Sequence, residues 1–299
     1  MKKITRQSYI LRRLHLFWRR NFAVIIALPL MLALAYYILK VEPDQLRITE
    51  YTFEHALITP ELDGSVIAFV ADIHASSRRR PLWQRAIKLI NERPNLAAIL
   101  LGGDFINGNG RGDRIEQLLD SFADFKQRNL LYSIPGNHEY RYPAGGFSKI
   151  QKAFAEKDLP LLQDQNVLIK LPNGGKINLI GLDYSSNPHR REDRRRFKNI
   201  FHKNMLNIVL CHTPEDFPFL PGNAHLTVSG HTHGGQLYLP GIGSVINPGS
   251  YGRKYSYGKI REGSKTLLVT SGLGSAYAQA RFCMKPEIVF VTLKSLRKN

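Results

Sequence analysis

The sequence predicts a mixed α/β sandwich preceded by one membrane-spanning helix. Three observations predict it. Short apolar runs alternate with helical patterns through the first half of the main region, and the later part is rich in strand patterns. Side chains of metal-ligating type follow the ends of several of these runs, as they do in α/β proteins. An uncharged apolar run, residues 22–39, lies ahead of that region.

The apolar run comes first in the chain. As an α-helix, residues 22–39 would span about 27 Å, close to the thickness of the hydrocarbon layer. Pro29 is costly in a soluble helix but tolerated in a membrane span. Lysine and arginine dominate before the run, whereas the flank after it is mixed and slightly acidic. The positive-inside rule therefore places the N-terminus in the cytoplasm and the large domain outside it.

These features divide the chain into four parts. We predict a basic cytoplasmic segment at 1–21, an uncleaved transmembrane signal anchor at 22–40, a juxtamembrane segment at 41–63 and a main domain at 64–299. The protein would then be a single-pass membrane protein, with its main domain on the non-cytoplasmic face.

Two other interpretations of the apolar run stay open. A cleaved signal peptide would use the small residues Ala33 and Ala35, and Arg19-Arg20 is a feature of twin-arginine export. A buried core helix is disfavoured because the run is apolar on all sides.

The main region shows alternating patterns with neither an internal repeat nor a low-complexity linker. We expect helices at 83–91, 115–128 and 147–157. We expect strands at 46–58, 66–71, 97–101, 130–135, 177–182, 206–211, 226–229, 266–270 and 287–293.

Composition bounds the class of protein. Hydrophobic residues make up 43% of the chain and charged residues 22%, which are globular values. The formal net charge of +18 favours anionic partners such as phosphorylated substrates or anionic lipid heads. Cys211 and Cys283 are the only cysteines, so there is no disulfide framework.

Five short clusters carry the candidate chemistry, and five of the ten histidines lie in them. They are Asp72 with His74, Asp104, Asn137 with His138 and Glu139, His212, and His231 with His233. Oxygen and nitrogen ligands without cysteine suit Mn, Fe or Zn better than a structural zinc knot. For Asp72 and Asp104 the alternative role is helix capping, and Glu139 has the alternative role of a surface acid. Asp183 follows a strand, and we interpret it as structural.

The order of these clusters, D-x-H, G-D, G-N-H-E, H and G-H-x-H, resembles that of the calcineurin-like metallophosphoesterase family over about residues 64 to 293. The tail from Gly272 through Arg281 to Glu287 resembles its membrane-anchored bacterial phosphodiesterase branch, and this resemblance implies a bacterial inner (cell) membrane as the location of the anchor. The resemblance implies a four-layer α-β-β-α sandwich of two mixed sheets that holds two divalent metal ions.

Roles follow from the resemblance, motif by motif. The first metal ion would be bound by Asp72, His74 and His233, with Asp104 bridging to the second. The second would be completed by Asn137, His212 and His231. A hydroxide shared by the two ions would attack phosphorus. We expect His138 to act as general acid and Glu139 to orient it through a hydrogen bond.

Two basic runs remain. Arg78, Arg79 and Arg80 follow the first motif, so we expect their loop to overlook the site. Residues 190–203 are either a solvated helix face or a surface that recognises a diphosphate or an anionic lipid head.

The predicted function is hydrolysis of phosphodiester or pyrophosphate bonds by a membrane-anchored enzyme, with manganese among the candidate metals. One alternative is a hydrolase like UDP-2,3-diacylglucosamine pyrophosphatase of lipid A biosynthesis, which the predicted export opposes. A second is a catalytically silent fold that binds a partner protein, which the complete ligand set opposes. Substrates would be phosphoesters, lipid-linked diphosphates among them. No nucleic-acid partner is expected, because no recognised nucleic-acid module is present. Substrate, native metal and oligomeric state stay open.

Overall fold

The structure is a computed structural model that describes residues 6–78, 80–107, 115–142, 146–184, 193, 197, 199–245, 251–275 and 278–296. Its α-helices are α1 Arg6–Tyr36, α2 Arg80–Asn91, α3 Ile115–Asp120, α4 Asn137–Tyr140 and α5 Gly146–Glu156. A π-helix, η1 Tyr37–Val41, continues α1, and η6 Pro214–Phe219 and η7 His233–Gly235 are 3₁₀ turns.

The strands form two mixed sheets and one small hairpin. The first sheet has the order β1-β13-β2-β3-β4, from β1 Arg47–His55, β13 Glu287–Ser295, β2 Val66–Val70, β3 Leu96–Leu101 and β4 Leu131–Ser133. The second has the order β11-β12-β8-β7-β6-β5, from β11 Gly258–Glu262, β12 Lys265–Val269, β8 Leu226–Ser229, β7 Asn207–Leu210, β6 Lys176–Gly181 and β5 Gln165–Lys170. The hairpin pairs β9 Tyr238–Leu239 with β10 Gly243–Ser244.

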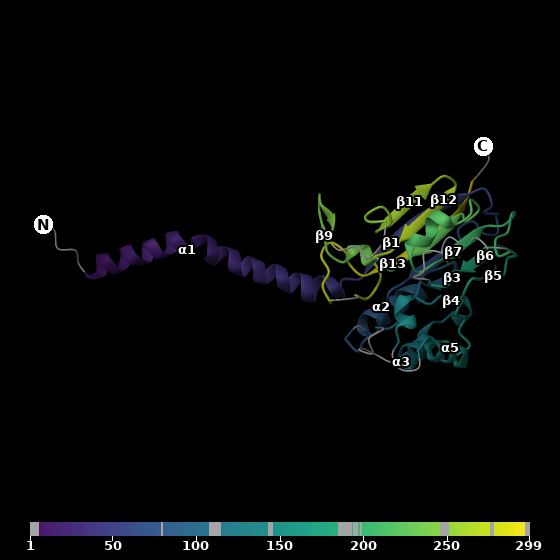
Figure 1. Cartoon of the computed structure of the whole chain (residues 1–299), viewed down its shortest axis with the longest axis horizontal. Helices are drawn as coiled ribbons and strands as arrows, with labels where there is room; N and C mark the ends of the chain where they lie inside the picture. Colours follow the sequence, from purple (N-terminus) through teal and green to yellow (C-terminus); the bar gives the residue numbers. More distant parts are fainter. Residues whose placement is uncertain are drawn as a thin grey trace.

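The two sheets face one another and are covered on their outer sides, which confirms the predicted four-layer fold (Figure 1). Apolar side chains from the facing sides, such as Phe69 and Leu210, form the central core. Helices α2, α3 and α5 cover the first sheet. In the described part of the chain, the outer face of the second sheet packs against η6 and Tyr255.

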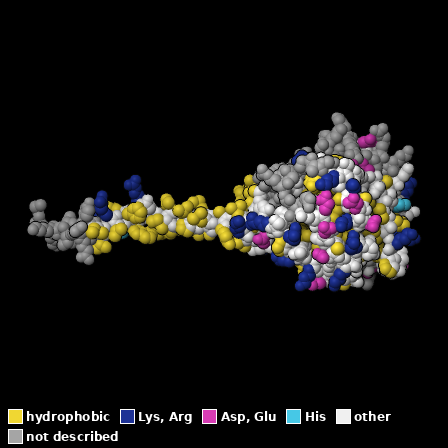
Figure 2. All heavy atoms as spheres, turned by 90° about the horizontal axis from the view of Figure 1, so that it is seen from below, with side chains coloured by type: hydrophobic (Ala, Val, Ile, Leu, Met, Phe, Trp, Pro, Cys, Tyr) yellow, Lys and Arg dark blue, Asp and Glu magenta, His cyan; other side chains and the backbone are white. Residues whose placement is uncertain are grey.

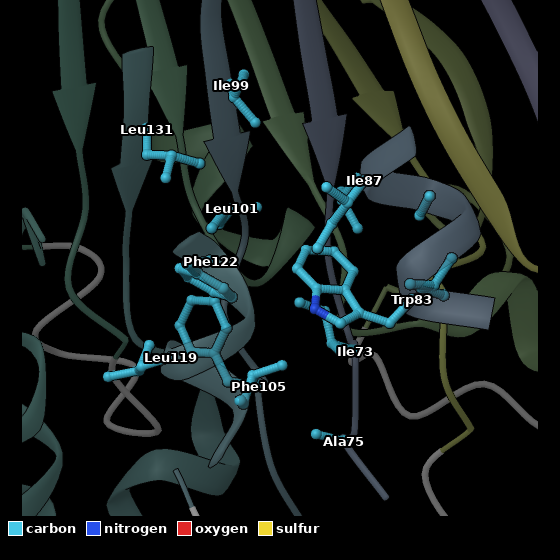
Figure 3. Close-up of a cluster of buried hydrophobic side chains, with 14 of the residues drawn as sticks. Ile73, Ala75, Trp83, Ile87, Ile99, Leu101, Phe105, Leu119, Phe122 and Leu131 are labelled. Atoms are coloured by element: carbon cyan, nitrogen blue, oxygen red, sulfur yellow. The ribbon is translucent and has the colours of Figure 1, made fainter. Parts of the chain in front are cut away.

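The core under the first sheet also supports the site. Trp83 and Ile87 of α2 point toward Leu101 and Phe122 in this cluster (Figure 3). Ile73, which follows β2, is buried in the same cluster at 2% exposure. The chain that carries the first metal-ligand motif is therefore anchored on close-packed apolar side chains, which resist displacement.

The N-terminal helix α1 extends away from the domain (Figure 1). By length and composition it is the one helix in the described residues that is long and apolar enough to cross a membrane, and its apolar window is not buried in the protein. The helix passes through Pro29 without interruption.

Residues 47–55 are more closely integrated than the predicted juxtamembrane segment implied. β1 pairs in parallel with β13 along its whole length, from Arg47 beside Glu287 to His55 beside Ser295. The carboxylate of Glu287, which is buried, accepts a hydrogen bond of 2.9 Å from Arg47. The sheet of the domain thus begins before residue 64.

The helix predicted at 115–128 is shorter in the structure. α3 ends at Asp120 and the chain tightens into a 3₁₀ turn at Ser121–Asp124. Ser121 explains the change, because its Oγ accepts a bond of 2.7 Å from the indole of Trp83 and donates to the carbonyl of Leu118. Strands β5 and β11 were not predicted, because as edge strands they bury few apolar side chains.

Candidate metal centre

The five clusters converge because parallel strands of both sheets end at one edge. Asp72 follows β2 and Asp104 follows β3 in the first sheet, while His212 follows β7 and His231 follows β8 in the second. Side chains beyond the carboxyl ends of parallel strands share a crevice in α/β folds. All four come from loops that a close-packed core holds in place.

The backbone of these loops is in an uncommon conformation. Asp72, His74, Asp104, His231 and His233 have φ values of 55°, 43°, 52°, 70° and 52°. Such left-handed φ values cost of order 1–3 kcal/mol each in non-glycine residues and persist where the surroundings enforce them. Five of the seven predicted metal ligands share this strain, which is the kind that clusters at functional sites.

The ligand atoms form three overlapping groups. Asp72, His74 and His233 make one group, His74, Asp104 and His138 a second, and Asp104, His212 and His231 a third. Within each group the candidate atoms lie within 4.8 Å of one another. Because His74 and Asp104 each belong to two groups, the three groups form one continuous site.

Asp104 lies at the centre. Its Oδ2 atom is 3.4 Å from Nε2 of His212, 3.7 Å from Nε2 of His74 and 3.8 Å from Nε2 of His138. Its Oδ1 atom accepts a hydrogen bond of 2.8 Å from the backbone N–H of His138. A carboxylate in this position can contact groups on both sides of the site.

The first side of the site pairs His74 with His233. Their Nε2 atoms are 3.2 Å apart, and Nε2 of His233 is 3.9 Å from Oδ1 of Asp72. The Nδ1 atoms of both rings are buried without a hydrogen-bond partner among the described residues. The backbone N–H of His231 donates to both oxygens of Asp72, at 3.1 and 3.0 Å.

The second side joins His212 and Asn137. Nε2 of His212 lies 3.1 Å from Oδ1 of Asn137, and its Nδ1 lies 2.8 Å from the carbonyl oxygen of Gly102. That carbonyl fixes the ring and selects the tautomer that leaves Nε2 facing the site. The hydroxyl of Ser229 donates to the carbonyl of His212 at 2.9 Å, which holds the loop.

Burial and mutual charge shift the titration of these groups. Burial lowers the pKa of His74 to about 4 and the pKa of His233 well below its usual range, so both rings are neutral at pH 7. Burial opposes the charged form of His212, yet the adjacent Asp104 carboxylate raises the pKa of His212 to about 9. Burial, together with Asp104, raises the pKa of Asp72 to about 7. Crowded buried carboxylates and imidazoles of this kind mark functional sites.

The donors fit divalent metal ions. Neutral imidazole nitrogens and carboxylate oxygens are the ligands that Mn, Fe and Zn take in proteins. His74 and His233 direct nitrogen atoms toward each other at 3.2 Å beside the Asp72 carboxylate. A cation between these atoms would satisfy all three. The structure therefore brings all seven predicted ligands together, and their assignment to metal stays a proposal.

Glu139 has contacts that the sequence did not reveal. Its carboxylate is fully buried and accepts backbone N–H bonds from Asp104 at 2.9 Å, Phe105 at 2.8 Å and Gly136 at 2.7 Å, with a longer one from Ile106 at 3.4 Å. The side chain therefore joins the loop after β3 to the start of α4, and its orientation of His138 stays a prediction. Burial, together with Asp104, raises the pKa of Glu139 to about 7.

His138 lies at the open side of the site. Its side chain is 20% exposed, whereas the side chains of His74, His212 and His233 are between 0% and 3% exposed. Its ring meets the ring of His74 edge-on at 4.7 Å. This position, next to the buried donors yet open to solvent, suits a group that meets the substrate.

Two tyrosines near the opening were missed by sequence reasoning. The hydroxyl of Tyr140 donates to Asp183. The ring of Tyr184 lies edge-on to His212 with centroids 6.0 Å apart. Tyr140 directly follows the G-N-H-E motif, and this position in the sequence is the feature that could have identified it as a residue near the site.

Arg281 was noted only as part of a resembling tail. It is fully buried and donates to the carbonyls of Ser271 at 2.9 Å, Gly272 at 3.1 Å and Met284 at 2.7 Å. A Cβ atom on Gly272 would collide with the side chain of Asp72. The arginine thus holds the loop that packs directly behind the first metal-ligand motif.

The basic runs lie away from the centre or outside the described residues. Nη2 of Arg78 donates to the carbonyl of Leu39, at 3.4 Å, so its side chain reaches the end of the N-terminal helix rather than the site. Arg79 and half of the residues in 190–203 lie outside the described part of the chain.

The fold and the site together define a metallophosphoesterase. A model of the calcineurin-like phosphoesterase family matches residues 65–235. The match covers more than half of the chain, and the chain belongs to this family.

Two similar proteins are named as a metallophosphoesterase and a phosphodiesterase. The chain is 29% identical over 266 residues to the uncharacterized metallophosphoesterase YkuE of Bacillus subtilis, covering 85% of this chain and 87% of the relative. It is 28% identical over 238 residues to the phosphodiesterase YaeI of Escherichia coli, covering 76% and 81%. A solved structure, TT1561 of Thermus thermophilus, matches with a TM-score of 0.42 and 11% identity over 70% of this chain and 90% of that one; this likeness is too distant to add to the argument.

Proposed function

We propose that the protein is a membrane-anchored phosphoesterase that depends on two divalent metal ions and hydrolyses phosphodiester or pyrophosphate bonds. The observation that carries the proposal is the position of Asp104. Its Oδ2 atom lies 3.7 Å from Nε2 of His74 on one side of the site and 3.4 Å from Nε2 of His212 on the other side. Family membership supports the reaction class.

Each residue has a part in this proposal. The first metal ion would be held by Asp72, His74 and His233, the second by Asn137, His212 and His231, with Asp104 shared. Two such ions supply a water-derived nucleophile at neutral pH and neutralise charge on the phosphate. His138 is placed to contact the scissile phosphate and to protonate the leaving oxygen.

Membrane attachment rests on α1. Its apolar window is unburied, and a helix of that composition is unstable in water unless lipid or protein covers it. We propose that the helix stays uncleaved and anchors the enzyme in a bacterial inner membrane, with the domain on the non-cytoplasmic face.

One narrower substrate class has support from the join between helix and domain. The backbone N–H of Arg281 donates to the carbonyl of Ile38 at 3.0 Å, so the anchor ends against the loop behind Asp72. A site this near the membrane suits a lipid-linked diphosphate. A UDP-2,3-diacylglucosamine pyrophosphatase-like activity is the specific alternative, and it requires the domain to face the cytoplasm.

The test is an assay of the purified full-length protein with phosphomonoesters, phosphodiesters and pyrophosphoesters, a lipid-linked diphosphate included. Activity should disappear with chelator and return with Mn, Fe or Zn. Bound metal should be close to two ions per chain in the wild type. Hydrolysis unaffected by chelation, with no bound transition metal, would contradict the proposal. A stable protein that binds two ions but hydrolyses none of the substrates would instead support the silent, partner-binding alternative.

A further inference from the structure

The hairpin β9–β10 carries an exposed apolar surface next to the candidate metal centre. Leu239, Ile242 and Val245 are 37%, 59% and 55% exposed, and they lie within seven residues of one another. Single exposed apolar side chains are ordinary, but a cluster at the end of a projecting hairpin marks an interaction surface. The hairpin begins at Tyr238, five residues after the predicted ligand His233.

Hydrogen bonds connect the hairpin to the end of the membrane helix. The N–H of Tyr238 donates to the carbonyl of Phe282 at 2.8 Å, and the N–H of Phe282 donates to Gln236 at 2.9 Å. The residue before Phe282 is Arg281, whose N–H donates to Ile38. The hairpin and the end of the helix therefore bond to two consecutive residues, Phe282 and Arg281.

A buried acid also connects the helix to these residues. Glu42 directly follows the π-helix η1, is 1% exposed and accepts a hydrogen bond of 2.7 Å from the N–H of Met284. Helix and hairpin are therefore both bound to residues 281–284. Figure 1 shows both at the same end of the domain, with β5 and β6 at the opposite end. Anchoring of the helix would hold the hairpin at the surface of the bilayer.

Charge at the join agrees with a lipid surface. Lys40 is exposed, Arg78 donates to the carbonyl of Leu39, and Arg85 donates to the carbonyl of Asp44 at 3.2 Å. Figure 2 shows hydrophobic side chains continuing from the helix onto the adjoining edge of the domain, with basic side chains beside them. Apolar residues flanked by cations fit the boundary between acyl chains and anionic headgroups.

We propose that the β9–β10 hairpin is a second membrane contact, which inserts Leu239, Ile242 and Val245 into the lipid layer beside the anchor helix. The occupant of this apolar surface is the bilayer itself. The inference rests on the anchoring given under Proposed function. Its consequence is that the candidate metal centre lies near the headgroups, where an amphiphilic phosphoester would reach it without leaving the membrane.

The experiment uses the full-length protein in vesicles of phosphatidylcholine and phosphatidylglycerol, with nitroxide spin labels on single cysteines. The background is Cys283→Ser, because Cys283 is exposed and Cys211 is buried. Labels are placed at Ile242→Cys in the hairpin, Leu30→Cys in α1 and Lys176→Cys at the start of β6. The measured quantity is the ratio of accessibility to oxygen, which concentrates in lipid, to that of a water-soluble nickel chelate.

The label at Ile242 should show a severalfold higher ratio than the label at Lys176, and a lower ratio than the label at Leu30. Adding Leu239→Asp and Val245→Asp should return the Ile242 label to the value of Lys176 and leave the Leu30 label unchanged. Both substituted side chains are exposed, and an unchanged circular dichroism spectrum would show that the domain stays folded.

Two outcomes overturn the inference, and they are distinguishable. If Leu30 is in lipid while Ile242 matches Lys176, the anchor stands and the hairpin contact is wrong. If the Leu30 label itself is aqueous or has been removed by cleavage, the proposed anchoring fails, and the hairpin contact fails with it.

Discussion

The carboxylate oxygen Oδ2 of Asp104 lies 3.4 Å from Nε2 of His212, although the two residues follow strands of different sheets. Asp104 follows β3 in the first sheet and His212 follows β7 in the second. The candidate metal centre therefore lies across the interface between the sheets. Its geometry depends on how the sheets pack as well as on each loop.

Asp104→Asn should reduce bound metal at both positions. The amide keeps the size of the side chain but removes the negative charge that faces His74 and His212. We expect less than one metal ion per chain by elemental analysis, and a loss of hydrolysis. Asp183→Asn, outside the three ligand groups, is the matched control and should keep the metal content of the wild type. Normal metal content in Asp104→Asn would argue against a shared ligand.

His138→Ala should leave bound metal nearly intact while the rate of hydrolysis falls by about 10²–10⁴, the usual worth of positioned acid catalysis. The side chain of His138 is 20% exposed, and its backbone N–H, rather than its ring, makes the 2.8 Å bond to that carboxylate. Elemental analysis beside single-turnover rates checks this. A variant that loses its metal would instead make His138 a ligand.

Glu139→Gln should destabilise the domain more than it changes the pH profile. The amide nitrogen of glutamine would face backbone N–H groups that now donate to carboxylate oxygens, such as those of Phe105 and Gly136. Leaving buried donors unpaired costs about 1–3 kcal/mol. Thermal unfolding of the chelator-treated protein measures this effect. A variant with unchanged stability but a shifted acid limb of activity would restore the predicted role in orienting His138.

His225 should make folding sensitive to mild acid. Burial, together with His55, lowers the pKa of His225 to about 4 from an ordinary value of 6.5, and its Nδ1 accepts a bond of 3.0 Å from the N–H of Asn207. Because the folded pKa is the lower one, the unfolded chain takes up the proton first as pH falls. The contribution to stability is complete above 6.5 and declines between 6.5 and about 4.

Denaturant unfolding at pH 7.5 and pH 5 checks this in the wild type and in His225→Asn. The asparagine variant should lose less stability between the two values, since it lacks the titrating ring. An equal loss in both proteins would show that other groups cause the acid sensitivity.

The orientation in the membrane is open to a direct measurement. The segment before the apolar run is rich in basic residues, which favours a cytoplasmic N-terminus and an exported domain. A reporter active only after export should therefore work when it is fused after Asn299. A reporter active only in the cytoplasm should be silent at the same position. Cytoplasmic signal alone would reverse the orientation, and it would bring the site into the compartment that the lipid A alternative requires.

The sequence alone was sufficient for the fold class, the family and the candidate ligands that the structure brings together. Strands such as β2 and β8 are buried on both faces, so they appear as continuous apolar runs. The motif residues directly follow these runs, and parallel strands bring their ends together. The apolar runs and the order of the motifs along the chain were therefore enough to identify the candidate ligands without coordinates.

Only the tertiary structure decided how the parts contact one another. Four backbone N–H groups surround Glu139, and no local pattern shows which donors will reach a side chain from another loop. Strand β1 joins the sheet by pairing with β13, which lies more than 200 residues later in the chain. Arg281 and Glu42 connect the N-terminal helix to the loops behind the site through bonds across similar separations. Such contacts depend on the packing of the whole chain, because distance along the sequence says little about distance in the folded protein.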